Sequence, residues 1–417
     1  MSKLTELLDE LCPDGVEYRP FSEVIERLRT GLNPRKNFIL NSPGSKNYYI
    51  TVRELGGFNI ETTEKTDLVN DAGLQLIQNR SGLRKGDVLF SGTGTIGRTA
   101  LVSTEPKDWN IKEGVYALTP DHSILDSRFL VYALNSSRFQ NAVHARAAGG
   151  TVKSISMKNL SVLTLPIPPL EVQQEIVRVL DAFTALEQSL VSELELRKKQ
   201  YVEYRDTAIE DLVNGNAPSV NLGDHARTVN GLTGKNKSDF SDGNAKFITY
   251  RNVFSNPEVD LEINDYVKVA GGEKQNQVEL GDVIFTGSSE SREEVGFSAV
   301  VTRTPAEPIY LNSFCFMVRF EDPEFIDPGF AKHMFRSRPI RKQIMKAANG
   351  VTRINISKPR FMRVEVPVPP MEMQQEIAVK LDAFSSLIQS IEQEISLRRT
   401  QYEFYRDELL SFAPQED

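Results

Sequence analysis

The chain reads QQEIVRVLDAFTALEQSLVSELELRKKQYVEYRD from Gln173 to Asp206, and QQEIAVKLDAFSSLIQSIEQEISLRRTQYEFYRD from Gln374 to Asp407. The two segments lie a constant 201 residues apart, and more than half of their positions are identical without a gap. Each follows a proline-rich segment, PIPPLEV at Pro166 and PVPPMEM at Pro367. A repeat of this length indicates that a whole structural unit is duplicated within the chain.

Apolar residues recur in both segments at steps of three and four, which places them on one stripe of an α-helix. They are Ile176, Leu180, Phe183, Leu186, Leu190, Leu194, Tyr201 and Tyr204 in the first segment, and Ile377, Leu381, Phe384, Leu387, Ile391, Ile395, Tyr402 and Tyr405 in the second. Neither segment contains glycine or proline, and Asn214-Gly215 is a helix stop signal after the first. Each helix should have about 40 residues and measure about 60 Å.

A helix of this length with a single apolar stripe needs a partner in water, and the second copy is the simplest one. We therefore expect two long antiparallel helices packed as a coiled coil. The alternative is that each helix covers only its own globular domain.

The composition excludes several classes of protein. An apolar fraction of 40% in 417 residues fits two or three globular units. No apolar segment is long enough to cross a membrane, and the N-terminal MSKLTELLDELCPDG lacks the apolar centre of a signal peptide. Two cysteines exclude a disulfide framework or a cysteine-rich metal site, and the four histidines have no ligand spacing. We expect a soluble, cytoplasmic protein without a metal.

The net charge of −8 is unevenly distributed. Residues 170–213 contain ten acidic and five basic side chains, and residues 371–417 contain ten and four, so the rest of the chain carries +3. The helical regions are therefore acidic and the regions between them mildly basic. This distribution leaves a nucleic-acid partner open for the globular regions.

The repeat divides the chain into five regions. Globular domains are expected at residues 16–165 and 216–366, and the long helices lie in residues 166–215 and 367–417. Residues 1–15 contain a short amphipathic helix over residues 2–11, which corresponds at the 201-residue offset to the tail of the first long helix. This correspondence predicts that the two chain ends lie close together in a closed, circular arrangement with pseudo-two-fold symmetry.

Both globular domains follow one pattern of short strands and a later helical segment, which predicts an α+β fold with two α/β domains joined by the helices. In the first domain the strands are expected at Tyr48–Val52, Asp87–Phe90, Thr99–Ser103 and Gly114–Thr119, and the helical segment at Asp126–His144. The second domain repeats this pattern, with its helical segment at Asp327–Ala347. The domains differ in most side chains, whereas the helices differ little. Such a contrast is typical of two different recognition domains on a common spacer.

Two short signals could indicate catalysis. Gly92–Gly97 matches GxGxxG after a strand, but the following residues favour another strand, so we expect a tight turn and no cofactor loop. Asn41-Ser42-Pro43-Gly44 partly matches the Asn-Pro-Pro-aromatic signature of amino-methyltransferases but lacks the second proline and the aromatic residue. We therefore expect no catalytic apparatus on this chain.

Several segments together resemble the specificity subunits of type I restriction-modification systems, over essentially the whole chain. They are the start Cys12-Pro13-Asp14-Gly15, the paired PIPPLEVQQEI and PVPPMEMQQEI segments, the Gly-Asp-Val-[Leu/Ile]-Phe strands at Gly86 and Gly281, and the loops Gly150–Ser156 and Gly350–Ser357. The resemblance implies two target recognition domains, each reading one half of a bipartite double-stranded DNA site. It implies that the helices set the spacer between the halves.

The same resemblance implies partners for the chain. The helices should bind two methyltransferase subunits, which restriction/translocase subunits join. N6-adenine methylation would use S-adenosylmethionine bound to the methyltransferase, so no cofactor is expected on this chain.

Lysine and arginine on phosphates supply most of the affinity for DNA, and base edges supply the sequence information. Basic residues in loops are therefore the DNA-binding candidates: Arg35, Lys36, Arg80, Arg84, Arg98 and Lys153 in the first domain, and Lys235, Lys237, Arg251, Arg292 and Arg353 in the second. Lys153 and Arg353 lead this set because they occupy the same loop in both copies. Asn33, Asn79, Asn230 and Asn252 are secondary candidates for contacts to adenine. For each residue, a solvated surface charge or a turn residue is the alternative.

We predict that the acidic outer faces of the helices and four tyrosines near their ends bind the partner subunits; these are Tyr201, Tyr204, Tyr402 and Tyr405. Two other functions stay open. The chain could be a coiled-coil scaffold that binds only protein, or a self-contained methyltransferase.

Overall fold

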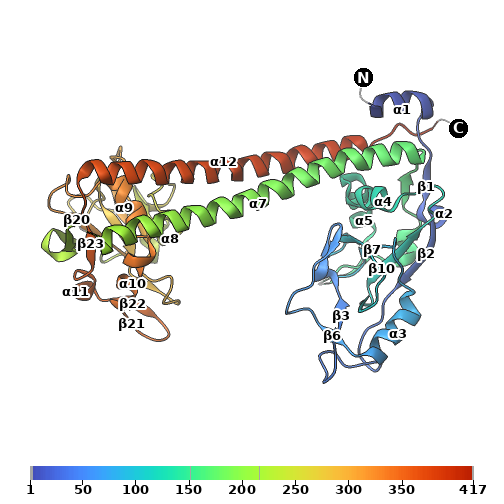
Figure 1. Ribbon diagram of the computed structural model, residues 1–417, viewed down its shortest axis with the longest axis horizontal. Coiled ribbons are helices and arrows are strands. Elements are labelled where there is room, and N and C mark those ends of the chain that lie inside the picture. Colours follow the sequence, from blue (N-terminus) through green and yellow to red (C-terminus); the bar gives the residue numbers. More distant parts are fainter. Residues whose placement is uncertain (1–2, 151, 216, 416–417) are drawn as a thin grey trace. The chain divides into compact units, whose positions relative to one another are not determined.

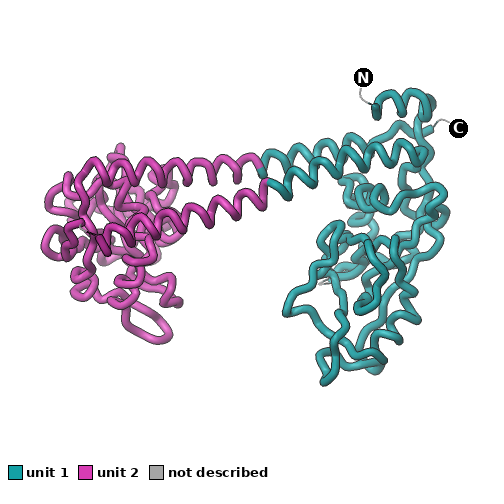
Figure 2. The backbone as a smooth tube through the Cα atoms, in the orientation of Figure 1, with its two compact units in different colours: residues 1–189, 395–417 teal, residues 190–394 magenta. Residues whose placement is uncertain are grey.

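The computed structural model describes residues 3–150, 152–215 and 217–415. The chain forms two compact units, residues 1–189 with 395–417 (unit 1) and residues 190–394 (unit 2), shown in two colours in Figure 2. Each unit contains one globular head and a part of both long helices. We refer to residues 16–165 as head 1 and to residues 217–366 as head 2.

The two predicted long helices are confirmed as α7 (Leu170–Asn214) and α12 (Met371–Leu409), labelled in Figure 1. In each unit the two helices pack antiparallel, and the apolar stripe supplies the contacts. Aromatic rings meet across the helix pair at centroid distances of 5.4 Å for Phe183 with Tyr405 in unit 1 and 5.7 Å for Tyr204 with Phe384 in unit 2. These two ring pairs are the same pair of sequence positions, exchanged between the helices. The coiled-coil prediction is therefore confirmed.

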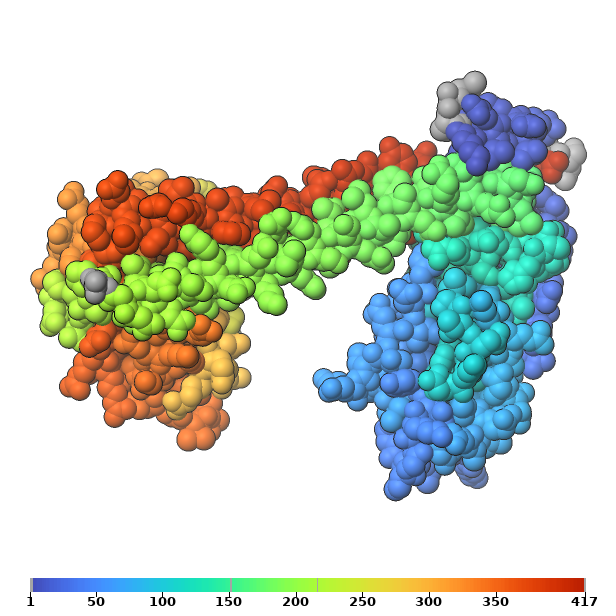
Figure 3. Space-filling model, in the orientation of Figure 1, coloured from blue at the N-terminus to red at the C-terminus, as the bar shows by residue number. Residues whose placement is uncertain are grey.

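The N-terminal helix α1 (Lys3–Leu11) packs on the first turns of α7, as the dark blue residues in Figure 3 show. Leu4 joins the core of unit 1, and the ammonium group of Lys3 lies 3.3 Å from the carboxylate of Glu175. Arg178 and Lys3 together lower the pKa of Glu175 to about 2. The predicted first residue of this helix, Ser2, lies outside the described residues.

The two ends of the chain meet within unit 1, as the repeat predicts. Val16 N donates to Ala413 O at 2.9 Å, and Gln415 N donates to Val16 O at 3.1 Å. Gly15 has φ +92°, and a Cβ there would lie 2.6 Å from Ala413 O, so glycine is required for this approach. The C-terminal segment thus pairs with the start of head 1.

Head 1 is built on a four-stranded antiparallel sheet in the order β2-β10-β7-β8. A second sheet has the order β6-β3-β9, with β3 parallel to β9, and the short strands β4 and β5 pair with each other. The strand bounds are β1 Tyr18–Pro20, β2 Ile25–Thr30, β3 Asn47–Ile50, β4 Leu55–Gly56, β5 Asn59–Ile60, β6 Leu68–Val69, β7 Val88–Ser91, β8 Thr99–Leu101, β9 Trp109–Ile111, β10 Val115–Pro120 and β11 Thr164–Pro166. Strands β1 and β11 pair antiparallel at the point where the head meets α7.

Head 2 repeats the two main sheets of head 1, but its described strands include no counterpart of the β4–β5 pair. Its sheets have the orders β13-β20-β16-β18 and β15-β14-β19, with β14 parallel to β19, and β12 pairs with β23 as β1 pairs with β11. An additional sheet, β17-β22-β21, is described below. The bounds are β12 Ser219–Asn221, β13 Ala226–Asn230, β14 Ala245–Ile248, β15 Tyr266–Val267, β16 Val283–Thr286, β17 Ser288–Ser289, β18 Ser298–Val300, β19 Ile309–Leu311, β20 Cys315–Phe320, β21 Ala348–Asn349, β22 Ile354–Ile356 and β23 Glu365–Pro367.

The predicted helical segment is two helices in each head. Residues Asp126–His144 form α4 (Ser127–Asn135) and α5 (Ser137–Arg146), because Ser136 ends the first helix and its hydroxyl caps the second. Residues Asp327–Ala347 form α9 (Pro328–Met334) and α10 (Arg338–Lys346). The remaining helices are α2 Phe21–Val24, α3 Asp71–Ser81, α6 Met157–Ser161, α8 Tyr250–Ser255 and α11 Lys358–Phe361.

The long helices belong to the hydrophobic cores of the heads. In unit 1, Ile176 and Leu180 of α7 are fully buried in one cluster with side chains of β7, α4 and α5. In unit 2, Ala378 of α12 and Ile209 of α7 lie in the corresponding cluster. Each head is therefore continuous with the helices, so that its attachment does not rest on surface contacts.

A buried glutamine at the start of each repeat fixes this attachment. Gln173 Oε1 accepts from Asp126 N at 2.9 Å, and its Nε2 donates to Ile124 O and Pro168 O, both at 2.7 Å. Gln374 forms the same contacts in unit 2, accepting from Asp327 N at 2.9 Å and donating to Pro369 O at 2.9 Å. The carboxamide thus joins the start of the long helix to the first helix of the head.

The aspartate at the end of each repeat is the second anchor. In unit 1, Asp407 of α12 accepts from the backbone N of Ser137 at 3.0 Å and from its hydroxyl at 2.6 Å. In unit 2, Asp206 of α7 accepts from Arg338 N at 2.9 Å. Each head is therefore anchored by the start of one long helix and the end of the other. This is the physical reason why each copy of the repeat begins with a glutamine and ends with an aspartate.

About two turns after each glutamine anchor, an aspartate of the long helix contacts the first helix of each head through a different partner. In unit 1, Tyr132 donates from its hydroxyl to Asp181 at 2.6 Å. The corresponding residue in unit 2 is His333, whose Nε2 lies 2.7 Å from Asp382 and whose Nδ1 lies 2.9 Å from the hydroxyl of Tyr201. His333 is fully buried, and burial lowers its pKa.

Replacing the buried anchor in unit 1, Gln173→Leu, should destabilise that unit by about 3 kcal/mol. The substitution leaves one N–H and two carbonyl groups without partners, at about 1–3 kcal/mol for each buried group. Trp109, the single tryptophan of the chain, lies in β9 of head 1, so urea unfolding followed by its fluorescence reports unit 1. The exposed neighbour provides the control, because Gln174→Leu should change the unfolding free energy by less than about 0.5 kcal/mol. Equal effects of the two substitutions would contradict the anchor.

Acid should weaken the anchoring of head 2. The pKa of His333 in the folded chain lies below its ordinary value of 6.5, so the unfolded chain binds the proton first as pH falls. Stability is therefore lost from about pH 6.5 downward, until the lower folded pKa is passed. Asp382, Lys332, Tyr201 and Arg205 are the charged or titratable groups that act on this histidine.

His333→Tyr reproduces the contact of Tyr132 and should remove this pH dependence. Hydrogen–deuterium exchange of α9 between pH 7 and pH 5 measures it. A variant whose α9 still loses protection over the same pH range would show that another group is responsible.

Candidate nucleic-acid interface

In head 1, the turn between β7 and β8 packs against the loop that precedes α6. Gly94 N donates to Lys153 O at 3.0 Å, and Ile155 N donates to Gly92 O at 2.9 Å. The loop is closed at its base by two hydrogen bonds of 2.8 Å between Ala148 and Ser154. These hydrogen bonds fix the backbone of the loop on both sides of Lys153, whose side chain is exposed. Thr151 of this loop lies outside the described residues.

Head 2 builds the same loop with regular strands. β17 pairs with β22, and β22 pairs with β21, so the β16–β18 turn and the loop before α11 form one small sheet. Arg353 lies directly before β22, with its guanidinium 5.3 Å from the ring centroid of Phe314 and 3.2 Å from Ser288 Oγ. Lys153 and Arg353 thus lie in the same loop of the two heads, as the sequence predicts, but one position apart. The bridges Thr93–Ser154 and Ser288–Asn355 show that Lys153 corresponds to Ile354.

The glycine-rich GTGTIG segment, residues 92–97, is the turn of an antiparallel hairpin. β7 and β8 flank it and pair with each other, and no helix follows. Gly97 has φ +93°, which the tight turn requires. The predicted turn is confirmed, and the geometry differs from the strand-to-helix loop that surrounds a dinucleotide. Residues 41–44 also form a turn, closed by Ser45 N to Ser42 O at 2.9 Å.

Each head has a cleft beside one hairpin turn, which is the β7–β8 turn in head 1 and the β16–β18 turn in head 2. The cleft of head 1 has a volume of about 630 Å³ and is lined by charged side chains, among them Arg35, Arg53, Asp67, Lys112 and Glu113. The cleft of head 2 has about 660 Å³ and is lined by aromatic side chains next to one arginine, namely Tyr250, Phe254, Phe314 and Arg353, together with Ser288 and Glu294. The two clefts overlap at three equivalent positions, Val52 with Tyr250, Thr93 with Ser288 and Gly114 with Phe314, and they differ in their chemistry.

Several predicted DNA-binding residues are exposed and form no ion pair within 4 Å to another described residue. They are Arg35, Lys36, Arg84, Lys153, Lys237 and Arg251. Arg35 lines the cleft of head 1, and Lys153 lies on the adjoining loop. Arg292 is also exposed. The hydroxyl of Ser291 and, to a lesser degree, the charge of Arg292 lower the pKa of Glu293.

Other predicted residues are engaged within the chain. Arg80 Nε donates to Gly31 O at 3.0 Å, and Arg98 donates to Val52 O at 3.4 Å. Lys235 forms an ion pair of 2.6 Å with Glu273, and its side chain is only 9% exposed. A DNA contact by Lys235 would require that this pair opens, which makes Lys237 the better placed of the two lysines.

The four predicted asparagines all have partners within their heads. Asn252 is buried, and both ends of its amide bind the backbone of Asp260, at 2.7 and 3.1 Å. Asn33 donates to Glu113 at 2.7 Å, Asn79 accepts from Gln75 at 3.0 Å, and Asn230 accepts from Lys358. Asn33 is the one of these four that lines a described cleft.

The structure adds basic residues that the sequence analysis missed. Arg53 and Lys112 line the cleft of head 1, and Arg53 corresponds to the predicted Arg251, because both follow an Ile-Thr-X segment at the end of a strand. Arg84 and Arg29 lie close to Arg27. Burial, followed by the charges of these two arginines, lowers the pKa of Arg27. The alternating Arg-Leu-Arg of β2 was the signal for this second cluster.

The four predicted partner-binding tyrosines contact residues of their own unit. Tyr201 pairs with His333, Tyr402 packs on the core of unit 1, and Tyr204 and Tyr405 form the ring pairs between the helices. Tyr204 is 37% exposed and Tyr405 is 40% exposed, so each presents one edge to solvent. Their role in binding a partner stays a prediction.

Among the described residues, no group of three or more metal-ligating side chains is placed to bind a metal ion. The described helices also include none with the length and hydropathy that a membrane span requires.

A sequence model of the type I restriction modification DNA specificity domain matches the chain twice, over residues 13–196 and 216–397. The chain belongs to this family. Each match begins next to one head and extends into the long helix that follows it, so the repeat seen in the sequence is the family's domain in duplicate.

Relatives of this specificity subunit include the specificity subunit of the type I restriction enzyme EcoR124I/EcoR124II from Escherichia coli. It is 32% identical over 293 residues, which cover 66% of this chain and 70% of the relative. The scaffold that binds only protein is not favoured by this membership.

Solved structures share the fold. A chain from a structure of type I restriction-modification complex assembly aligns over 95% of this chain and 98% of its own length, with a TM-score of 0.62 and 17% identity. The S subunit from M. genitalium aligns over 95% and 96%, with a TM-score of 0.51 and 16% identity.

Lys153→Gln and Arg353→Gln should each weaken binding of the specificity subunit to a short DNA duplex and lower the salt dependence of affinity. A lysine or arginine on a phosphate contributes about one unit to the slope of log K against log salt. Fluorescence anisotropy at several salt concentrations measures this slope. Lys235→Gln is the matched control, because Glu273 already neutralises this lysine. If the control lowers the slope as much as the two test variants, the loop assignment is wrong.

Proposed function

We propose that each head of this specificity subunit reads one half of a split double-stranded DNA site. The observation that carries this proposal is the pair of overlapping clefts beside the corresponding turns of the two heads, with different linings. Charged and amide groups can bind base edges by hydrogen bonds, and aromatic groups favour apolar contacts such as the thymine methyl. Two such heads with different linings select two different half-sites.

The loops beside the clefts supply the affinity. Lys153, Arg35 and Lys36 in head 1, and Arg353, Lys237 and Arg251 in head 2, contact phosphates or base edges. Lys153, Arg35, Lys36 and Arg353 lie in loops, which is where binding residues are commonly found. Arg251 lies in α8, and Lys237 begins a short 3-10 helix.

The chain itself performs no chemistry in this proposal. Two methyltransferase subunits bind the acidic helices and the exposed edges of Tyr204 and Tyr405, and restriction/translocase subunits join them. S-adenosylmethionine is bound by the methyltransferase, which transfers its methyl group to N6 of adenine. The complex acts on chromosomal DNA, so the proposal includes a cytoplasmic location.

A genome-wide map of N6-methyladenine, made with and without the gene, tests the proposal. A split motif should disappear when the gene is deleted and return when it is restored. Restoration with the Arg353→Lys variant keeps the charge but loses the planar fork of arginine, so it should relax one half of the motif only. If the split motif persists without the gene, the proposal is wrong.

The helices should act as the spacer. Removing Leu190–Leu196 from α7 and Glu392–Arg398 from α12 deletes one heptad from each helix. The deletion keeps the ion pair Glu187–Arg399 and removes Glu392, the partner of Lys198. The helix pair becomes about 10 Å shorter at 1.5 Å per residue, or about three base pairs at 3.4 Å each.

The methylated motif should keep both half-sites and lose about three base pairs from its gap. Deleting one heptad from α7 alone breaks the pairing with α12, and it should abolish methylation. Altered half-sites in the double deletion would refute the spacer role.

A further inference from the structure

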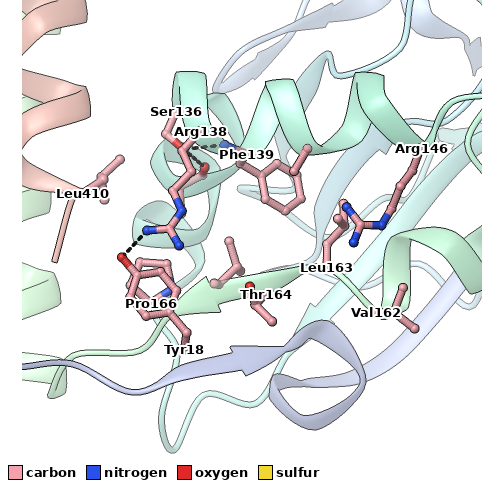
Figure 4. Close-up of a pocket in the computed structure, with 13 residues that line it drawn as sticks. Tyr18, Ser136, Arg138, Phe139, Arg146, Val162, Leu163, Thr164, Pro166 and Leu410 are labelled. Atoms are coloured by element: carbon pink, nitrogen blue, oxygen red, sulfur yellow. Dashed lines mark hydrogen bonds between the residues drawn. The ribbon is translucent and has the colours of Figure 1, made fainter. Parts of the chain in front are cut away.

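A pocket of about 250 Å³ lies in unit 1 between α5 and β11, away from the cleft of head 1 (Figure 4). Its floor is apolar and includes Ala133, Phe139 and Ala142. Arg138 and Arg146 lie on opposite sides of it, with Phe139 and Thr164 between them. The volume is that of about eight water molecules at about 30 Å³ each, enough for a small molecule or a long side chain.

Head 2 shows what this space accommodates. The two heads correspond at the 201-residue offset here, because Ser136 and Ser337 both donate from their hydroxyls to the residue three positions before, at 2.7 and 2.6 Å. The residues that correspond to Ala133 and Ala142 are therefore Met334 and Gln343. Both are long, and Met334 is fully buried. The pocket exists because head 1 has two alanines where head 2 has side chains that fill the space.

Gln343 makes two specific hydrogen bonds in head 2. Its Nε2 donates to Glu365 O at 2.9 Å, and its Oε1 accepts from Glu365 N at 3.0 Å. Glu365 lies on the edge strand β23, and its N–H and C=O point away from the paired strand β12. A single carboxamide therefore satisfies both polar groups of this strand edge.

The corresponding strand edge in head 1 has no such partner from α5. Phe21 N donates to Leu163 O at 2.9 Å, and Ile167 N donates to Glu17 O at 3.0 Å, so alternate residues of β11 bind the segment of β1. The intervening Thr164 therefore directs its N–H and C=O to the other side, toward the pocket that it lines. The side chain of Ala142 has no polar atom that could form a hydrogen bond with the N–H or the C=O of Thr164.

We propose that this pocket binds a primary carboxamide on an unbranched chain, such as the side chain of glutamine. The carboxamide pairs with the N–H and C=O of Thr164 as Gln343 pairs with Glu365, and the chain occupies the space that Met334 fills in head 2. The proposal is independent of DNA recognition, since none of the residues proposed to bind DNA lines this pocket.

The two arginines select what else the ligand carries. Arg138 is fixed by Tyr18, with its guanidinium 4.2 Å from the ring centroid and 2.6 Å from the hydroxyl. Arg146 is exposed and forms no ion pair within 4 Å to a described residue. A carboxylate on the ligand, next to the carboxamide, therefore finds a cation at the rim. N-acetyl-L-glutamine combines both groups in one small molecule.

The test is a titration of the full chain with N-acetyl-L-glutamine, followed by NMR of ¹³C-methyl alanine. The methyl signals of Ala133 and Ala142 should shift and saturate. N-acetyl-L-glutamate, which has the same shape, should bind at least fivefold more weakly, because its carboxylate has no N–H for the carbonyl of Thr164. Equal or tighter binding of the glutamate would overturn the proposal, as would the absence of a shift with the glutamine.

Two variants make the test independent of the probe. Ala142→Gln places the carboxamide of head 2 in head 1, and it should raise the melting temperature and abolish the shift at Ala133. Gln343→Ala removes the carboxamide from head 2, and N-acetyl-L-glutamine should restore part of the lost melting temperature. Unchanged binding to Ala142→Gln, or rescue of Gln343→Ala without any binding to the natural chain, would show that head 1 has no such site.

The same titration distinguishes a free ligand from a side chain of a partner. If added methyltransferase subunit prevents the shift of Ala142, the carboxamide comes from the partner. If the shift is retained in the presence of the methyltransferase, the ligand is a free small molecule. Loss of the split methylation motif in the genome would have no bearing on either result.

Discussion

The buried carboxamides of Gln173 and Gln374 are the contacts on which the arrangement of each unit depends. Each one satisfies backbone groups of the head and of the proline-rich segment before the helix, in an interior where an unpaired polar group is costly. The carboxylates of Asp407 and Asp206, near the ends of the long helices, then bind the first residue of α5 in head 1 and of α10 in head 2. Because each head uses the start of one helix and the end of the other, neither helix can be changed alone. The two copies of the repeat keep the same anchoring residues because each long helix anchors one head with its start and the other head with its end.

The heads are under a weaker constraint. Their sheets have the same strand order and pairing, and apolar side chains of any compatible shape can fill their cores. Residues on the loops beside the clefts contribute little to these cores and can be exchanged without loss of the fold. Arg53 and Lys112 in one cleft and Tyr250 and Phe314 in the other show the result. The side chains that line the clefts can therefore diverge while the sheets and cores of the heads are retained.

The long helices could be predicted in detail, because a 3.6-residue period over more than thirty residues is a strong signal, and a duplicated segment supplies its own partner. The turn at Gly92–Gly97 and the shared loop of Lys153 and Arg353 also followed from the sequence, since glycine and the repeat mark them. The break at Ser136 did not, because a serine can cap a helix or lie within it. The ion pair of Lys235 and the packing of Tyr402 depend on residues distant in the sequence, which local patterns do not reveal. Base contacts depend on loop geometry, and the sequence alone leaves it open.

The pairing of Val16 with Ala413 and Gln415 joins the segment after α1 to the segment after α12 in one short parallel contact. The same two units should therefore form in a circularly permuted chain. A gene rearranged to begin at Ala217 and to join the present ends through a short linker would encode a circular permutant with the same two units. By the same logic, a gene that encodes a single head and a single long helix would give a subunit that must pair with its own copy. Such a homodimer would recognise an inverted repeat, so duplication followed by fusion is the route by which a symmetric ancestor could gain two unequal half-sites.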